Sequence, residues 1–322
     1  MRPTPEFALI DRYFTRPARR ADTVLGVGDD AALLAVPPGH WLVATTDTMV
    51  AGTHFLPGDD PAALGHKLLA VNLSDLAAMG ADPAWFTLSL TLPAVELDWL
   101  AAFAGGLFAL ADAAGIELIG GDTTRGPLSL TVQALGTVPT GLALRRDGAQ
   151  PGDGIYVSGT LGDAALALAL RLEDASVPTE LVTRLDRPTP RLALGRALRG
   201  RASAAIDISD GLLADLGHLC ARSGVGAEID FAALPRSTAF DAAARGAADA
   251  DKPLCGGDDY ELCFTLPAAQ ETGIGALSAA GGCALTRIGR ITTEPGVRCQ
   301  DAAGRLVTPA RTGFDHFSGA ER

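Results

Sequence analysis

The chain has 322 residues, of which 48% are hydrophobic and 20% charged, so it is expected to be globular rather than disordered. Lys and Arg total 26 against 38 Asp and Glu, and the resulting net charge of −12 argues against a nucleic-acid scaffold, which needs a basic face. The five cysteines form no C-x-x-C pair, which disfavours a disulfide framework or a zinc site. Without a signal-like N-terminus or a window near 18 uninterrupted apolar residues, the sequence predicts a cytoplasmic protein without a membrane partner.

The first half of the chain alternates strand and helix signals. Side-chain periods of two and of about 3.6 residues distinguish them. The predicted elements are, in chain order, strands over 24–28 and 41–44, a helix over 60–80, a strand over 86–92, a helix over 95–114 and strands over 117–119 and 128–138. Asp60 and Pro61 are a suitable N-cap and first residue for the first helix, and Gly80 a suitable end.

The second half repeats this alternation after a stretch that loses periodicity. Residues 139–151 carry Pro, Gly and charge, so we expect a linker there, between a domain of residues 1–138 and one of residues 152–322. The predicted elements beyond it are strands over 155–157, 204–208, 225–231 and 260–266 and helices over 161–172 and 211–222. Alternating strands and helices predict layered α/β structure in both domains.

Aspartates follow several of these predicted strands. Asp29, Asp30, Asp47 and Asp122 follow such strands, and Asp207 and Asp210 flank the end of the strand over 204–208. In open α/β sheets, ligands bind where the carboxyl ends of strands meet, so these side chains are expected to share one crevice. Each one alone is also explained by ordinary turn or capping chemistry.

Asp75 supports the same site from a helix. Leu68, Asn72, Asp75 and Met79 fall at steps of three and four residues, which places two polar side chains on an apolar stripe. A carboxylate there is costly unless it is paired or bound to a metal. The alternative is an Asn72–Asp75 hydrogen bond that only closes a contact.

An oxygen-rich set of this kind is suited to Mg²⁺, which keeps water ligands and bridges to phosphates. Gly120 and Gly121 precede Asp122 and could let backbone amides approach an anion. The sequence has no G-x-x-x-x-G-K-[ST], and the glycines at 26 and 28 run into Asp29 and Asp30 instead of completing a dinucleotide fingerprint. Ser209 does not lie in a G-x-S-x-G nucleophile motif.

Six segments together resemble thiamine-monophosphate kinases, in the expected order from about Glu6 to Phe317. They are GVGDDAA at 26–32, TTDTMVAGTHF at 45–55, NLSDLAAMGADP at 72–83, GGDTTRG at 120–126, DISDG at 207–211 and GGDDYEL at 256–262. The resemblance implies the two-domain fold of the aminoimidazole ribonucleotide synthetase superfamily, with an N-terminal α/β domain that dimerises through its sheet and a C-terminal α/β domain that completes the site.

The resemblance also implies the reaction: ATP phosphorylates thiamine monophosphate to thiamine diphosphate, by direct in-line transfer assisted by several Mg²⁺ ions in a homodimer. Whether K⁺ is needed stays open. The implied metal ligands are Asp30, Thr45, Thr46, Asp47, Asp75, Asp122, Asp207 and Asp210. The implied nucleotide contacts are Gly121, Asp122, Arg146 and Ser209. The implied substrate contacts are His54, Asp258 and Phe314. The residues expected to serve catalysis are Asp47, Asp75, Asp122, Arg146 and Asp210.

Some of these assignments have alternatives. Asp258 stands where the family usually has Glu, one methylene longer, so the substrate contact could be mediated by water or pass to Glu261. Phe314 is equally explained as a core anchor, and His54 as a solvated loop residue. The alternatives for the whole protein are another enzyme of the superfamily, of the aminoimidazole ribonucleotide synthetase type, and a non-catalytic module that binds magnesium and nucleotide.

Overall fold

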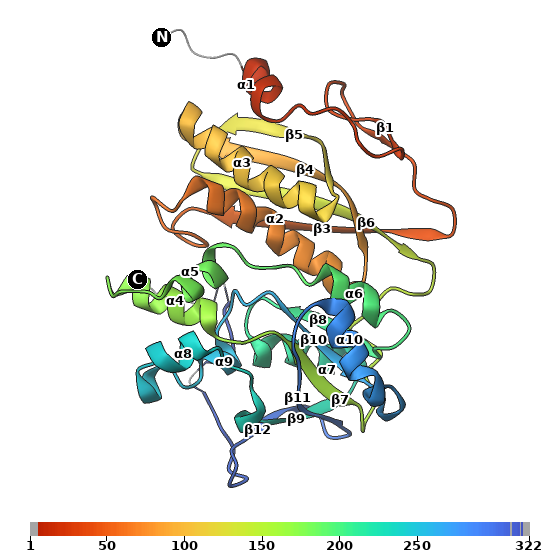
Figure 1. The fold of residues 1–322 in the computed structure, drawn as a ribbon, viewed down its shortest axis with the longest axis vertical. Coiled ribbons are helices and arrows are strands. Elements are labelled where there is room, and N and C mark those ends of the chain that lie inside the picture. Colours follow the sequence, from red (N-terminus) through yellow and green to blue (C-terminus); the bar gives the residue numbers. More distant parts are fainter. Residues whose placement is uncertain (1–5, 310, 316, 318–322) are drawn as a thin grey trace. The chain divides into compact units, whose positions relative to one another are not determined.

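The chain forms a four-stranded and a six-stranded sheet, besides a small two-stranded one, in the computed structural model, which describes residues 6–309, 311–315 and 317. Contacts divide it into two units. Unit 1 comprises Met1–Leu76 and Ala81–Gly141, and unit 2 comprises Ala77–Gly80 and Leu142–Arg322. Each unit has its own sheet and helices (Figure 1).

Unit 1 holds the four-stranded sheet and the helices that cover it. Its elements are α1 (Glu6–Tyr13), β1 (Thr23–Leu25), β2 (Leu33–Leu34), β3 (His40–Val50), α2 (Pro61–Ala78, whose last residues are assigned to unit 2), β4 (Asp82–Leu92), α3 (Leu97–Ala114), β5 (Glu117–Arg125) and β6 (Ser129–Pro139). The strand order is β3-β6-β4-β5, so β3 and β5 are the two edges. Only β4 and β5 pair in parallel; the other two pairs are antiparallel.

Helices α2 and α3 lie together on one face of this sheet (Figure 1). Glycine lets them approach closely: a Cβ at Gly65 would lie 2.1 Å from the carbonyl oxygen of Phe103, and one at Gly106 would lie 1.8 Å from that of Ala62. Real side chains never come so near, so these two helices pack backbone to backbone at the glycines.

The predicted ends of α2 are confirmed. The Asp60 carboxylate accepts hydrogen bonds from the backbone N–H groups of Ala62 (3.1 Å) and Ala63 (3.2 Å), as an N-cap does. Gly80 has φ +65°, the left-handed conformation that commonly follows a helix C-terminus.

Helix α3 is long and apolar enough by composition to cross a membrane. The buried core helix of a globular protein passes the same test. Leu100, Phe103 and Leu107 of α3 are buried in unit 1, and its C-terminus is capped by Gly115 at φ +68°, as the sequence predicts.

Two strands are longer than the sequence analysis expects. Asp47 lies within β3, and Asp122 lies within β5, so the expectation that these carboxylates follow strand ends is wrong. β3 continues because threonines and valine favour extended backbone and because every residue of β3 is matched in register by β6. Polar side chains do not end a strand when one face of the sheet is open.

Unit 2 is built on the six-stranded sheet, in the order β12-β9-β11-β7-β10-β8. Its elements are β7 (Gly154–Ser158), α4 (Asp163–Leu172), α5 (Thr179–Asp186), α6 (Leu192–Leu198), β8 (Ala204–Ile208), α7 (Leu212–Ser223), β9 (Gly226–Asp230), α8 (Thr238–Ala243), α9 (Lys252–Cys255), β10 (Glu261–Leu266), α10 (Ile274–Gly281), β11 (Leu285–Thr292) and β12 (Gly296–Gln300). All strand pairs are antiparallel except β9 with β12.

Helices cover both faces of this sheet. Ile206 and Ile208 of β8 lie in one buried cluster with Leu216 of α7, whereas Ala205 lies in another with Leu194 of α6 and Leu277 of α10. The alternation along β8 therefore matches a three-layer arrangement, helix on sheet on helix.

The mixed helix and sheet fold with two domains is as predicted. The argument that the aspartates share one crevice does not hold, because it assumed parallel strands, whose carboxyl ends meet at one edge of a sheet. In both units most neighbouring strands run in opposite directions, so their carboxyl ends alternate between two edges. Any shared site must arise from particular side chains on the strands and loops.

Candidate functional site

In unit 1, oxygen atoms gather between β3 and α2. The Thr45 hydroxyl donates a hydrogen bond to the Asp75 carboxylate, and the backbone N–H of Asp47 donates to Asn72 Oδ1 at 3.1 Å. Thr45 and Asp47 are two residues apart on β3 and so share the face that α2 covers. The structure thus brings together Thr45, Asp47 and Asp75 of the predicted metal ligands.

Asn72 joins the helix to the strand in this cluster. It is 0% exposed, its side-chain N–H donates to the Leu68 carbonyl at 2.9 Å, and its oxygen accepts from Asp47. A buried amide needs such partners, since leaving one unmade costs about 1–3 kcal/mol. Asn72 therefore holds the backbone of Asp47 against α2.

Thr46 is not part of this cluster. As the residue between Thr45 and Asp47 it lies on the opposite face of β3, and its hydroxyl donates to the Val132 carbonyl at 3.1 Å. The next residue on that open face, Thr48, hydrogen-bonds to the Thr131 hydroxyl at 2.9 Å. The structure does not bring the Thr46 side chain together with Asp75.

Asp122 lies on the other edge strand. It pairs with Ser89 of β4, and that row continues through Thr131 to Thr48 of β3. Gly121 is paired with Leu88, and a Cβ at Gly121 would lie 1.8 Å from the Leu88 carbonyl oxygen. Close approach to β4 thus requires glycine at 121, and the predicted free phosphate-binding loop is a paired strand.

Asp30 and His54 lie in turns of unit 1. Asp30 is exposed, and its backbone N–H donates to the carboxylate of Asp29 at 2.8 Å. The half-buried His54 accepts the backbone N–H of Val50 at its Nδ1, 3.0 Å away, so the neutral ring carries its proton on Nε2. His54 is therefore oriented by the strand that precedes it and is not a freely solvated loop residue.

In unit 2, the segment after β8 forms a tight turn around a buried carboxylate. Asp215 of α7 accepts, at one oxygen, the backbone N–H groups of Ser209 (3.0 Å), Asp210 (3.0 Å) and Gly211 (3.1 Å). Burial, followed by the negative charge of Asp210, raises the pKa of Asp215 to about 7. Asp215 is thus the residue that shapes this turn.

Two more predicted residues contact the same turn through their backbones. The N–H of Asp258 donates to the Ser209 carbonyl at 2.8 Å, and the N–H of Phe314 donates to the Asp210 carbonyl at 2.9 Å. The Phe314 side chain is 51% exposed, which contradicts the alternative of a core anchor. Ser209, Asp210, Asp258 and Phe314 are therefore neighbours in unit 2.

Asp207 and Arg146 are placed differently. Asp207 is 4% exposed and alternates with Ile206 and Ile208, so it lies on the sheet face of Ala205. The side chain of Arg146 is exposed, while its carbonyl accepts the Ser223 hydroxyl at 2.7 Å.

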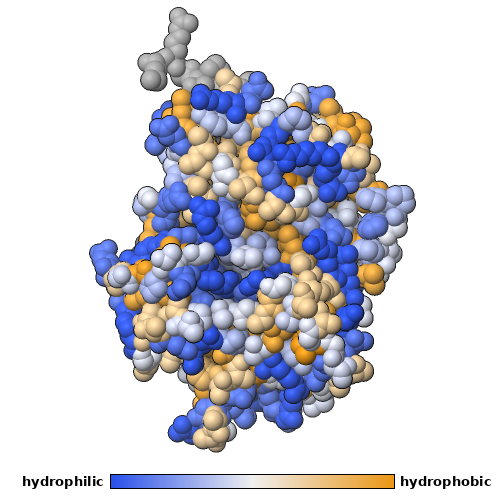
Figure 2. Space-filling model, in the orientation of Figure 1, coloured by the Kyte–Doolittle hydropathy of each residue, from blue (hydrophilic) through white to orange (hydrophobic). Residues whose placement is uncertain are grey.

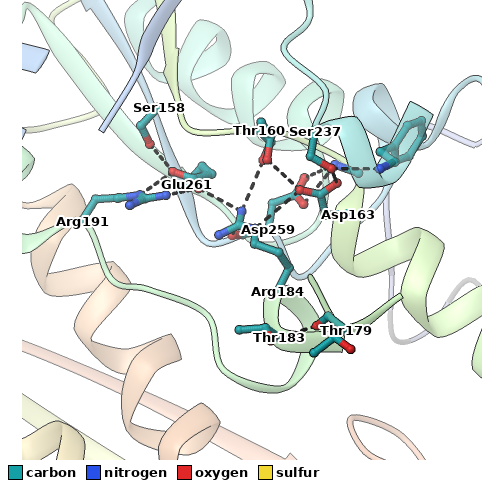
Figure 3. A network of polar contacts seen from close by, with 12 residues as sticks. Ser158, Thr160, Asp163, Thr179, Thr183, Arg184, Arg191, Ser237, Asp259 and Glu261 are labelled. Atoms are coloured by element: carbon teal, nitrogen blue, oxygen red, sulfur yellow. Dashed lines mark hydrogen bonds and ion pairs between the residues drawn. The ribbon is translucent and has the colours of Figure 1, made fainter. Parts of the chain in front are cut away.

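Glu261 is the centre of a buried polar network (Figure 3). It is 0% exposed and accepts hydrogen bonds from Ser158 Oγ (2.5 Å), from Arg191 Nε and Nη2 (2.6 and 2.5 Å) and from Arg184 Nη2 (2.9 Å). A carboxylate engaged by two guanidinium groups is fixed in place. This burial and engagement disfavour the alternative in which Glu261 replaces Asp258 as a substrate contact.

Asp259 is buried beside this network. It is 1% exposed, and both its carboxylate oxygens face the backbone N–H of Gly162, at 3.0 and 2.9 Å. Burial raises its pKa well above the ordinary value. Arg184 links the two acids, since its Nη2 also donates to the Asp259 carbonyl at 3.2 Å.

The residues on β3 and α2 have the chemistry that Mg²⁺ requires. Thr45, Asp47 and Asp75 offer hydroxyl and carboxylate oxygens and no sulfur or imidazole. Among the residues that the structure describes, no group of three or more His, Cys, Asp or Glu lies close enough to hold a metal ion. Mg²⁺ would therefore complete its shell here with water, hydroxyl or phosphate oxygens, which is its usual habit.

Sequence reasoning missed the supporting residues Asp215, Asp259, Tyr260, Arg184 and Arg191. Asp215 had a signal, an acidic residue in the first turn of a helix that follows a Gly-containing turn. The arginines had none, because they are 77 and 70 residues from the carboxylate that they bind.

Comparison with known proteins agrees with the resemblance over the whole chain. Residues 28–138 match the family model "AIR synthase related protein, N-terminal domain" and residues 150–302 the corresponding C-terminal domain. The thiamine-monophosphate kinase of Escherichia coli K12 is 51% identical over 97% of this chain and 98% of its own length.

Solved structures agree as well. That of thiamine-monophosphate kinase from Stenotrophomonas maltophilia K279a has a TM-score of 0.86 and 54% identity, covering 91% of this chain and 96% of its own. AaThiL complexed with AMPPCP and TMP has a TM-score of 0.78 and 33% identity, covering 88% and 89%. The chain belongs to the thiamine-monophosphate kinase family, among the AIR synthase related proteins.

Proposed function

We propose that the protein transfers the γ-phosphoryl group of ATP to the phosphate of thiamine monophosphate, giving thiamine diphosphate and ADP. One observation carries this conclusion: the chain is similar along almost its whole length to thiamine-monophosphate kinases, at 51% identity to that of Escherichia coli. A relative with 33% identity, AaThiL, has been solved with AMPPCP and TMP, which supports an ATP site and a thiamine monophosphate site in the same chain.

The site assignments are part of the proposal. Mg²⁺ is assigned to Asp30, Thr45, Thr46, Asp47, Asp75, Asp122, Asp207 and Asp210, with Thr46 contributing through its backbone or its open-face hydroxyl. ATP is assigned to Gly121, Asp122, Arg146 and Ser209, and thiamine monophosphate to His54, Asp258 and Phe314. When bound, Mg²⁺ would neutralise phosphate charge and hold donor and acceptor phosphates in line.

The protein's own residues then contribute mainly by positioning. The acceptor phosphate is already ionised, so no strong general base is needed, and phosphoryl transfer depends on orientation and charge neutralisation. Asn72 holds Asp47, and Thr45 holds Asp75. The exposed guanidinium of Arg146 can approach a phosphate, and the exposed ring of Phe314 can stack on an aromatic ring of the substrate.

A homodimer formed through unit 1 is also proposed. In the described part of the chain, β3 pairs on one side with β6 and has no strand on its other side. Its Trp41 and Leu42 are 49% and 48% exposed, and Val24 of β1 and Leu33 of β2 are 67% and 55% exposed. Figure 2 shows hydrophobic surface in the part of unit 1 where Figure 1 labels β1. A long edge strand that exposes hydrophobic side chains at its beginning favours pairing with a second copy.

The domain roles follow from the same resemblance. We assign metal and ATP binding and dimerisation to residues 1–138, a linker to 139–151 and the remaining substrate contacts to 152–322. The cytoplasm, where ATP is available, is the proposed location. A K⁺ requirement stays a question for experiment.

The test is ADP release from ATP and Mg²⁺ by the purified protein, with thiamine monophosphate, thiamine or aminoimidazole precursors as acceptor. We expect ADP only with thiamine monophosphate, together with an equal amount of thiamine diphosphate by chromatography. ADP release with an aminoimidazole precursor instead would favour the other superfamily enzyme. Binding of ATP without turnover under any condition would favour a non-catalytic module.

A further inference from the structure

The segment that carries Asp258 has an unusual backbone. Asp258 has φ +68° and Tyr260 has φ +50°, both in the left-handed region, whereas most residues with such angles in this chain are glycines. For a residue with a side chain this conformation costs about 1–2 kcal/mol. Two strained residues so close together require strong local anchors.

The anchors are Asp259 and Glu261, which alternate along the chain with the strained residues Asp258 and Tyr260. Asp259 and Glu261 are buried, and they bind the Gly162 N–H and the guanidinium groups of Arg184 and Arg191 (Figure 3). The backbone N–H of Tyr260 also donates to the Ile208 carbonyl at 2.8 Å. Asp259 and Glu261 therefore point inward and hold the turn in its strained shape.

Asp258 and Tyr260 are the half-buried members of this alternation, and they contact each other. The Tyr260 hydroxyl donates a hydrogen bond to Asp258 Oδ1 at 3.0 Å. A hydrogen bond to a carboxylate is about twice as strong as one between neutral groups, so the phenol restricts the rotation of the Asp258 side chain. Such a restraint matters here because Asp258 is one methylene shorter than glutamate and Glu261 is not available as a substitute.

We propose that Tyr260 is a positioning residue that orients the Asp258 carboxylate for binding the thiamine part of thiamine monophosphate. This inference deepens the proposed function and rests on it. The thiamine part carries a cationic ring and an amino group, and both favour a fixed carboxylate oxygen. Tyr260 acts only through Asp258, so its loss should affect thiamine monophosphate and not ATP.

The test compares the full-length wild type with Tyr260→Phe, Asp258→Asn and the double variant. Tyr260→Phe removes one oxygen atom and keeps the ring, so it preserves packing. We expect the KM for thiamine monophosphate to rise about three- to tenfold, with kcat within about twofold and the KM for ATP unchanged. In the Asp258→Asn background, the same change should raise that KM by less than about twofold, because coupled residues are not additive.

Tyr156→Phe is the matched control. Tyr156 lies in the same unit, is 5% exposed and stacks on Phe264 with ring centroids 5.7 Å apart, and it is not among the assigned substrate contacts. Its variant should leave the KM for thiamine monophosphate unchanged even if the melting temperature falls.

Three outcomes would overturn the inference. They are an unchanged KM for thiamine monophosphate in Tyr260→Phe, an equal rise in the KM for ATP, and the full effect persisting in the Asp258→Asn background. A wild type that does not turn over thiamine monophosphate would overturn the proposed function itself, and with it this role of Tyr260.

Discussion

Asp47 and Asp122 lie on the two opposite edge strands of one four-stranded sheet, in adjacent rows of its register. Three strand spacings, about 14 Å, separate their Cα atoms. Each carboxylate reaches at most about 4 Å from its own Cα, so at least about 6 Å remains between their oxygen atoms. Two ligands of one Mg²⁺ ion lie within about 4 Å of each other, because each is about 2.1 Å from the metal. Within one copy, Asp47 and Asp122 therefore cannot both be ligands of the same ion.

This separation gives the first prediction. Asp47→Asn and Asp122→Asn should each lower turnover by orders of magnitude while the fold stays intact. If one ion uses both carboxylates, they must come from two copies, and a mixed dimer of the two variants retains one intact site of two. We expect mixed dimers, purified through a different affinity tag on each variant, to recover about half of wild-type turnover. The site that lacks both carboxylates is inactive, and the intact site works normally.

Asp98→Asn, at an exposed position of α3, is the control variant and should retain wild-type turnover. Mixed dimers that stay as inactive as the two parents would show that Asp47 and Asp122 serve different ions or different steps in each chain.

Asn72 provides the second prediction. Asn72→Ala removes the buried amide that accepts the half-buried N–H of Asp47, so we expect the free energy of unfolding to fall by about 1–3 kcal/mol. Turnover should fall as well, because Asp47 is no longer held. Urea unfolding and kcat measure the two effects.

Thr48→Ala, on the open face of the same strand, should change the unfolding free energy by less than about 0.5 kcal/mol. If Asn72→Ala behaved like Thr48→Ala in both measurements, the hydrogen bond between Asn72 and Asp47 would have no role in positioning.

Local patterns predicted much of this fold, since helix caps and side-chain alternation act over a few residues. Asp60, Gly80 and Gly115 mark helix ends where the sequence predicts them. The strands were predicted too short at Asp47 and Asp122, because their length is set by their pairing partners Val132 and Ser89, which are 85 and 33 residues away in sequence. Sequence alone does not show such long-range pairing.

For the candidate site as well, local patterns predicted some residues and long-range contacts placed the others. The oxygen donors were found from residue type and motif, and Asn72 and Asp75 from helical spacing. The residues that hold them were missed, because Arg191 and Glu261 meet only in the folded unit. The direction of a side chain also depends on the strand: Thr46 is adjacent to two members of the cluster in sequence and lies on the other face.

The third prediction concerns the contact between α2 and α3. Gly106→Ala places a methyl group 1.8 Å from the Ala62 carbonyl oxygen, so the helices must separate, and we expect a loss of about 1–3 kcal/mol of stability or more. Gly105→Ala is the matched control, since a Cβ there meets no atom within 4 Å.

Because alanine is the better helix former, Gly105→Ala should stabilise the protein by up to about 1 kcal/mol. The two neighbouring substitutions thus have opposite expected signs in urea or thermal unfolding. Equal effects would show that the close helix contact does not limit stability.

The fourth prediction is a dependence of stability on pH that involves none of the assigned site residues. Asp249 is 0% exposed, and hydrogen bonds from Arg245 lower its pKa to about 2 despite its burial. A lowered pKa stabilises the folded state at pH values above the ordinary value near 4, and this contribution is lost as the pH falls through about 2. Its size at pH 7 is about 2 kcal/mol, since one pKa unit corresponds to about 1.4 kcal/mol.

Asp249→Asn should therefore be less stable than the wild type at pH 7, and the difference should shrink as the pH falls from 4 to 2. Urea unfolding of both proteins at pH 7, 4 and 2.5 measures it. Asp241→Asn is the control, because Asp241 is exposed and its ion pair with Arg236 is open to solvent, where such pairs contribute about 0–1 kcal/mol. A difference between wild type and Asp249→Asn that stayed constant with pH would mean that packing, and not the charge of Asp249, stabilises this part of unit 2.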